Sequence, residues 1–169
     1  DKDGKNQKDL TPFEKVRAGV VDDLKDNPNE MLIQMNKENP QVFDVYRINV
    51  NTGEMIVVGQ NPGNITGWQT DHNGKLRIAI TTDGVNQSVL YRDSEEQNFK
   101  PLLTTTFKET FAPLFFTFDN KNLYVSSNIG RDKASIVEYD LANNNEIKVL
   151  YENRDDDASG LSYSRKRQV

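Results

Sequence analysis

The sequence of 169 residues contains no cysteine and a single histidine, His72. Without cysteine the chain can form neither a disulfide nor a thiolate-bound metal site, and one histidine offers little for a nitrogen-ligated metal. The longest apolar run also falls far short of the ~18 residues that a membrane-spanning helix needs. We therefore expect no metal, no other cofactor and no membrane partner.

Strongly basic segments are missing as well. The chain has 21 Lys and Arg against 26 Asp and Glu, which gives a net charge of −5, and its basic residues are scattered. The short cluster at residues 165–167 would neutralise too few phosphates for tight binding. We therefore expect no nucleic-acid partner.

The clearest pattern that is present is a β-hairpin at residues 65–80. Residues 65–70 read as a strand, residues 71–74 as a tight turn, and Leu76, Ile78 and Ile80 alternate with more polar or smaller residues. Asn73-Gly74 is a pair that favours the positive φ of such turns. No segment has a convincing helical period.

The second strand of this hairpin recurs along the chain. Similar strands begin at Met31, Leu76 and Leu123, about 45 residues apart. The pattern predicts first strands at 16–21, 65–70 and 112–118, third strands at 42–50, 88–93 and 135–141, and fourth strands at 55–58, 99–103 and 147–151. Four antiparallel strands in about 45 residues are typical of a propeller blade.

The predicted fold is therefore all-β, a partial β-propeller of about three four-stranded antiparallel blades. We expect a flexible segment at 1–9 and a propeller part at 10–169, with blades at about 16–58, 65–103 and 112–151. Residues 10–13 read as the last strand of a preceding blade, and 159–169 as the start of a further one. Since propellers close with ~4 to 8 blades, three alone should expose blade faces, and we expect marginal stability or self-association through them.

Several phrases carry a resemblance to known families. Residues 68–76 and 116–124 resemble the Asp-containing blade signature of Tol-type, WD-like propellers. Residues 10–13, 44–47, 60–65, 114–119, 128–132 and 162–167 are similar to the N-terminal propeller of bacterial prolyl oligopeptidase-family serine peptidases. That resemblance covers nearly all of residues 10–169.

The resemblance implies that an α/β-hydrolase domain with a Ser-Asp-His triad follows on the same polypeptide. It also implies that the propeller covers the active site, admits peptide substrates and excludes folded proteins, in the cytoplasm or periplasm of a bacterium. An alternative function is a Tol-like or WD-like scaffold for protein–protein interaction. A weaker third possibility is a propeller glycosidase, whose paired carboxylates would have to converge at the channel, and the sequence gives no evidence that they do.

We expect no catalytic residue in this segment, so the hydrolase activity would belong to the longer parent. The nearest match to the nucleophile elbow Gly-x-Ser-x-Gly is residues 160–164, which end in Ser164 rather than glycine and precede no helical pattern. His72 lies in the hairpin turn, where a solvated turn residue is favoured over a general base. The aspartates at 155–157, and the Asp1-x-Asp3 pair, depart from the calcium-loop pattern and favour a solvated linker.

Two residues are candidates for substrate binding. Arg131 follows Gly130 in a loop and could offer a bidentate donor to a carboxylate of a peptide or of the hydrolase domain, although a local contact with Asp132 or the backbone is favoured. Trp68 could stack on a ligand if it faced the central channel, although packing between strands is the ordinary role for such an aromatic. Metal ligands are not expected.

Overall fold

The computed structural model describes residues 3–5 and 7–168, and every regular element among them is a β-strand. The first sheet contains β1 (Ala18–Asp22), β2 (Glu30–Asn39), β3 (Val42–Asn49) and β4 (Met55–Gly59). The second contains β5 (Ile65–Thr70), β6 (Leu76–Thr82), β7 (Gln87–Tyr91) and β8 (Lys100–Thr105). The third contains β9 (Phe111–Phe116), β10 (Asn122–Ser127), β11 (Ser135–Asp140) and β12 (Asn145–Tyr151).

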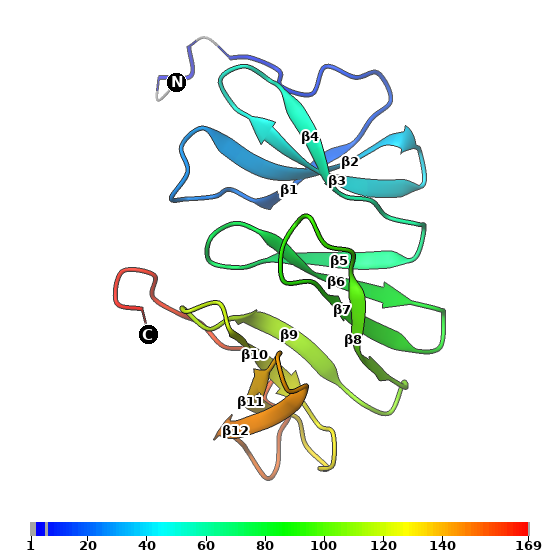
Figure 1. Ribbon diagram of the computed structural model, residues 1–169, viewed down its shortest axis with the longest axis vertical. Coiled ribbons are helices and arrows are strands. Elements are labelled where there is room, and N and C mark those ends of the chain that lie inside the picture. The colour runs from blue at the N-terminus through cyan, green and yellow to red at the C-terminus, as the bar shows by residue number, and fades with distance from the viewer. Residues whose placement is uncertain (1–2, 6, 169) are drawn as a thin grey trace. The chain divides into compact units, whose positions relative to one another are not determined.

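Within each sheet the strands follow one another in chain order and pair antiparallel, so each sheet is a simple meander (Figure 1). The predicted hairpin is present as β5 and β6. Gly74 closes its turn with φ +71°, a conformation that glycine adopts without a steric penalty. The predicted fold class, with three four-stranded antiparallel sheets, is confirmed.

The chain forms two compact units, Asp1–Gly63 and Asn64–Val169. In the first unit, Ile33, Met35, Tyr46 and Ile48 form a buried cluster on one face of the first sheet. Leu10, Phe13 and Val16, which precede β1, pack against that cluster. The Lys8 ammonium donates to the carbonyl of Asn51, 3.2 Å away, so the segment before β1 is also tied to the β3–β4 turn.

The second unit holds the second and third sheets around one core. Both sheets supply fully or almost fully buried apolar side chains to it: Ile78, Val89, Phe111, Phe116, Leu123, Val125, Val137, Tyr139 and Leu141. These side chains face one another across the two sheets, so burial of apolar surface holds the sheets together.

Two predicted strands are absent. Residues 10–13 and 159–164 have no strand structure. A strand needs a neighbour to accept and donate its backbone hydrogen bonds, and no described strand pairs with either segment. Instead Leu10 and Phe13 are held by their side chains. The predicted segments at 1–9 and 159–169 include residues 1, 2, 6 and 169, which lie outside the described residues.

The alternation of residue types along β6 is not matched by alternating exposure. Arg77 and Ala79, which alternate with the larger apolar residues, are 8% and 0% exposed. The register with β5 shifts between Gln69 and Thr70, which places Arg77 in a β-bulge. Both faces of β6 are therefore buried. Among the described residues no helix is long and apolar enough to cross a membrane.

Candidate functional site

Arg131 lies in the loop between β10 and β11, where Gly130 has φ +73°. Its Nη2 atom lies 2.6 and 2.7 Å from the two carboxylate oxygens of Glu146, on β12. The local partner is thus Glu146 rather than the expected Asp132. The two side chains are 25% and 29% exposed, and the Arg131 Nη1 atom is buried without a hydrogen-bond partner. In this conformation a carboxylate ligand would have to replace Glu146.

Trp68 lies on β5 and is partly buried. Its ring centroid is 5.9 Å from that of Phe99, with the two planes tilted by 52°. Phe99 also contacts the guanidinium of Arg92, whose carbon lies 4.3 Å from the Phe99 centroid. These contacts agree with the packing role considered for Trp68, and a role of Trp68 in substrate binding stays a prediction.

His72 joins two turns and is not the solvated turn residue that its sequence position favoured. The carbonyl of Phe116 accepts a hydrogen bond from His72 Nε2 over 2.8 Å, and the backbone N–H of His72 donates to Asn120 Oδ1 over 2.9 Å. The imidazole stacks on Phe118 with centroids 4.5 Å apart, and the ring of Tyr163 meets it edge-on at 5.2 Å. These contacts link the β5–β6 turn to the β9–β10 turn.

A buried arginine next to this turn escaped the sequence analysis. Arg77 Nη1 donates to Asp71 Oδ2 over 3.3 Å and to the carbonyl of Asn120 over 2.8 Å, so one cation bridges the second and third sheets. Its guanidinium carbon lies 4.8 Å from the ring centroid of Phe116. Asp71 is 6% exposed and also accepts from the backbone N–H of Lys75, which closes the turn. An Asp in a turn followed by an Arg is a weak signal, because the bulge that turns Arg77 inward leaves no mark in the sequence.

Tyr91 also contacts Arg77 and belongs to the same group of polar residues between the second and third sheets, which we call the junction. Its hydroxyl accepts a hydrogen bond from Arg77 Nη2 and donates to Asp93 Oδ1 over 2.6 Å. Burial, and then the hydrogen bond with Asp93, raise the pKa of Tyr91 to about 12, and the positive charge of Arg77 opposes them. The arrangement is suited to holding two sheets in register, because Arg77, Asp71 and the Tyr91 hydroxyl all have hydrogen-bond partners within the protein.

The described residues hold no nucleophile elbow. Residues 160–164 form neither strand nor helix, and Ser162 is exposed. Asp157 Oδ1 accepts from the backbone N–H of Ala134 over 2.7 Å, so at least one aspartate of the 155–157 run fixes the linker to the third sheet. Within 3–5 and 7–168 no group of three or more His, Cys, Asp or Glu side chains could hold a metal ion; Asp1 lies outside those residues.

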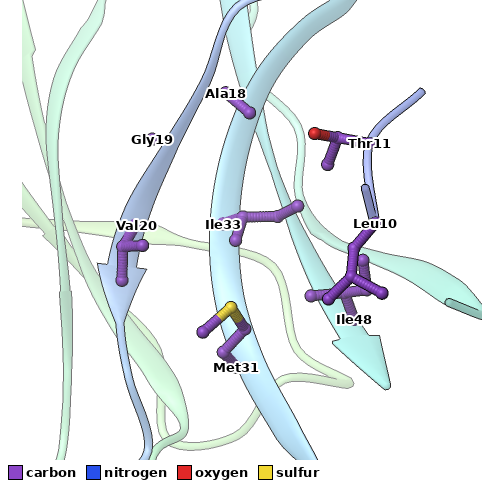
Figure 2. A pocket seen from close by; sticks show the side chains of 8 residues that line it. All are labelled: Leu10, Thr11, Ala18, Gly19, Val20, Met31, Ile33 and Ile48. Atoms are coloured by element: carbon purple, nitrogen blue, oxygen red, sulfur yellow. The ribbon is translucent and has the colours of Figure 1, made fainter. Parts of the chain in front are cut away.

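The first unit contains an apolar pocket of about 230 Å³ (Figure 2). It opens between β1 and the segment before it, over the buried cluster of the first sheet. Its lining residues are Leu10, Thr11, Ala18, Gly19, Val20, Met31, Ile33 and Ile48. Thr11 is the one residue with a polar side chain among them, so the pocket suits an aliphatic group rather than a charged one.

Comparison with solved structures defines the class of protein. The chain is similar to TolB from Acinetobacter baumannii with a TM-score of 0.52 over 72% of this chain and 29% of that chain, at 17% identity. At that identity the likeness concerns the fold alone, and the fold is that of a partial β-propeller. No family model matches the chain.

A sequence relative extends this result. The chain is 30% identical over 158 residues to dipeptidyl aminopeptidase BIII from Pseudoxanthomonas mexicana, a match that covers 88% of this chain and 22% of the relative. The resemblance to a propeller segment of a bacterial peptidase is therefore confirmed. The chain spans only about a fifth of the length of that peptidase.

Proposed function

We propose that this chain is the propeller segment of a serine peptidase and that it gates or positions peptide substrates for a hydrolase domain on the same polypeptide. The observation that carries the proposal is the similarity along 88% of the chain to a dipeptidyl aminopeptidase, of which the chain spans 22%. The catalytic groups would lie in the remainder of such a polypeptide. This segment would supply no catalytic residue.

Size is the physical basis of the gate. A folded domain of 100 residues has a radius of gyration of about 13 Å, whereas an extended peptide is far narrower. An active site covered by a propeller would admit the extended peptide and exclude the folded domain. Arg131 would act within this function by exchanging Glu146 for a carboxylate of the substrate or of the hydrolase domain, and Trp68 by contacting an apolar side chain of the peptide.

The proposal is tested on the longest polypeptide that contains this sequence. A fluorophosphonate probe reacts with the activated serine of a serine hydrolase, and peptide mapping locates the labelled residue. We expect the label outside residues 1–169, loss of peptide hydrolysis on labelling, and unchanged hydrolysis in Ser162→Ala. A label on Ser162, or hydrolysis that the probe does not inhibit, contradicts the proposal.

The gating part has its own measurement. A small protein that is cleaved when unfolded should resist cleavage when folded, with initial rates at least tenfold apart. A reference peptidase without a propeller provides the control for the intrinsic resistance of the folded substrate. If both enzymes show the same ratio of cleavage rates for the unfolded and the folded substrate, the gating function is contradicted. The alternative is then a scaffold function, in which the propeller binds another protein through its loops.

A further inference from the structure

The chain enters and leaves the second sheet at the same end. Ile65 starts β5 opposite Thr81. Thr105 ends β8 opposite Gln87, which starts β7 opposite Thr82 of β6. A meander of four antiparallel strands ends where it began, because each strand reverses the direction of the chain. A domain joined before or after such a sheet is therefore joined at this end.

We call this end of the second and third sheets the loop end. It carries the loops at residues 83–86, 106–110 and 128–134. Asn128 joins two of them: its Oδ1 accepts from the N–H of Thr110 over 2.7 Å, and its side-chain amide donates to the carbonyl of Lys108 over 3.4 Å. The loop between the two sheets is thus fixed to the third sheet.

Two large apolar side chains project from these loops into solvent. Phe107 is 81% exposed and Val85 is 68% exposed. The ring of Phe107 contacts Lys108, whose ammonium lies 5.8 Å from the ring centroid. Neither apolar side chain belongs to the core of the second unit. Their exposure is therefore not explained by the stability of the fold.

The opposite end of the same two sheets differs. Its turns lie at residues 71–75, 92–99, 117–121 and 141–144. The structure describes all residues of these turns, and none of them is an exposed large apolar residue. Tyr163, which contacts this end, packs its ring against His72 and Phe118. Of the loops and turns that connect the strands of these two sheets, only those at the loop end present large apolar side chains to solvent.

Hydrogen bonds within the two loops fix the positions of these side chains. Asp83 Oδ1 accepts from the N–H of Val85 over 2.9 Å. In the loop of Phe107, Glu109 Oε2 accepts from the N–H of Thr106 over 3.3 Å. A side chain on a loop of fixed conformation loses less conformational entropy when it binds a ligand.

The charged side chains beside Phe107 and Val85 argue against a permanent interface at this place. Asp83, Lys108 and Glu109 are exposed. The cores of permanent interfaces are depleted of charged residues, because covering a charge removes its hydration. A narrow, extended peptide can contact the apolar side chains and leave these charges in water, whereas a folded domain of flat surface would cover them.

We propose that Phe107 and Val85 bind apolar side chains of peptide substrates while the hydrolase domain acts on those peptides. The proposal rests on the proposed function, in which that domain belongs to the same polypeptide and would be joined at the loop end. Burial of apolar surface supplies the binding energy. The preferred substrates therefore carry aliphatic or aromatic side chains at positions away from the cleaved bond.

Specificity constants for two peptides test this contact in the longest polypeptide that contains the sequence. The two peptides have the same length, charge and cleaved bond, and they carry either leucine or alanine at positions remote from that bond. Phe107→Ala removes the ring. The matched control is Ile147→Ala, since Ile147 is 51% exposed on β12 and lies outside the loop end.

We expect Phe107→Ala to lower kcat/KM for the leucine peptide at least fivefold, mainly through a higher KM, and to change kcat/KM for the alanine peptide less than twofold. Val85→Ala should have the same selectivity and a smaller effect, because valine buries less surface. Ile147→Ala should leave both peptides within twofold. An equal change for both peptides in Phe107→Ala, or no change for either, overturns the proposal.

Thiol labelling distinguishes a contact with substrate from a contact with the hydrolase domain. Phe107→Cys and the control Ile147→Cys are prepared in the longest polypeptide, and peptide mapping gives the rate of modification at each position. Without peptide, we expect the two rates to agree within threefold. A saturating concentration of the leucine peptide, made uncleavable by N-methylation of the scissile bond, should slow labelling at position 107 at least fivefold and leave position 147 unchanged.

Two results of this labelling overturn the proposal. Protection of position 107 without peptide means that the hydrolase domain covers the site permanently. Equal rates at position 107 with and without peptide mean that no peptide binds there.

Failure of this contact and failure of the proposed function give different results. If the fluorophosphonate probe labels no serine outside residues 1–169, the proposed function fails, and the thiol measurement still tests peptide binding at Phe107 because it needs no hydrolysis. If the probe labels such a serine and Phe107→Ala changes neither peptide, the proposed function stands and the contact is overturned.

Discussion

In the first sheet, four side chains of β2 and β3 form an apolar face, which we call the first-sheet face: Met31 opposite Ile48, and Ile33 opposite Tyr46. In the third sheet, the corresponding four side chains of β10 and β11 form the third-sheet face: Leu123 opposite Tyr139, and Val125 opposite Val137. The two faces have similar side chains but different surroundings. In the third sheet, Leu123 and Val125 are completely buried against side chains from the second sheet. In the first sheet, Met31 and Ile33 border an open pocket. An alternating apolar strand thus determines that one face of the sheet favours burial. Which element buries that face depends on the neighbouring part of the structure.

The contact between the second and third sheets also includes buried polar groups. Arg77 connects Asp71 on its own sheet to the carbonyl of Asn120 next to the third sheet, while its guanidinium lies over the ring of Phe116. A cation buried in this way is stable only when its donors are satisfied, so it specifies one arrangement of the two sheets.

The largest expected effect comes from removing that cation. Arg77→Ala leaves the buried Asp71 carboxylate without its counter-ion and should lower the free energy of unfolding of the second unit by about 3–5 kcal/mol. Urea unfolding followed by the fluorescence of Trp68, the single tryptophan, reports on this unit. Arg131→Ala is the matched control: its pair with Glu146 is partly exposed and should contribute about 1 kcal/mol or less. Equal losses in the two variants would mean that the junction does not depend on Arg77.

A smaller effect should separate the two apolar faces directly. Leu123→Ala opens a cavity in a closed core and should cost about 2–5 kcal/mol. Met31→Ala, at the corresponding position, removes a partly exposed side chain beside an existing pocket and should cost about 1 kcal/mol. Urea unfolding followed by circular dichroism measures both variants. If Met31→Ala cost as much as Leu123→Ala, the first-sheet face would already be fully covered.

The smallest effect is a dependence on alkaline pH at the junction. The pKa of Tyr91 is about 12 in the folded protein against 10.0 ordinarily, so folding favours the neutral phenol. The stability that Tyr91 contributes is complete below pH 10 and is lost as the pH rises towards 12. Ultraviolet titration of phenolate, taken as the difference between the protein and Tyr91→Phe, measures this pKa. Asp93→Asn should lower it, whereas a difference titration centred near pH 10 would contradict the hydrogen-bonded geometry.

The hairpin shows how far the sequence could predict the fold. The predicted first strand at 65–70 coincides with β5, and the predicted turn at 71–74 is closed by Gly74. These features are local, since turn residues and alternation act over a few positions. The inward position of Arg77 was missed because a β-bulge adds one residue without changing the type of residue around it.

The candidate site was less predictable than the fold. Arg131 was correctly placed in a loop after a glycine, but its partner Glu146 lies on another strand and could not be read from spacing. His72 was expected to be solvated, and its contacts with Phe118 and Tyr163 depend on a second turn and on the segment after the third sheet. Both errors arose from contacts between residues that are distant along the chain.

The sequence by itself determined the all-β class, the order of the strands and the repeat of about 45 residues, because alternation and turn chemistry are encoded in neighbouring residues. Only the tertiary structure decided which apolar faces are covered, that Arg77 is buried, and that residues 10–13 and 159–164 do not form strands. Burial and strand pairing are properties of two elements together, so they follow from the neighbour as much as from the strand itself.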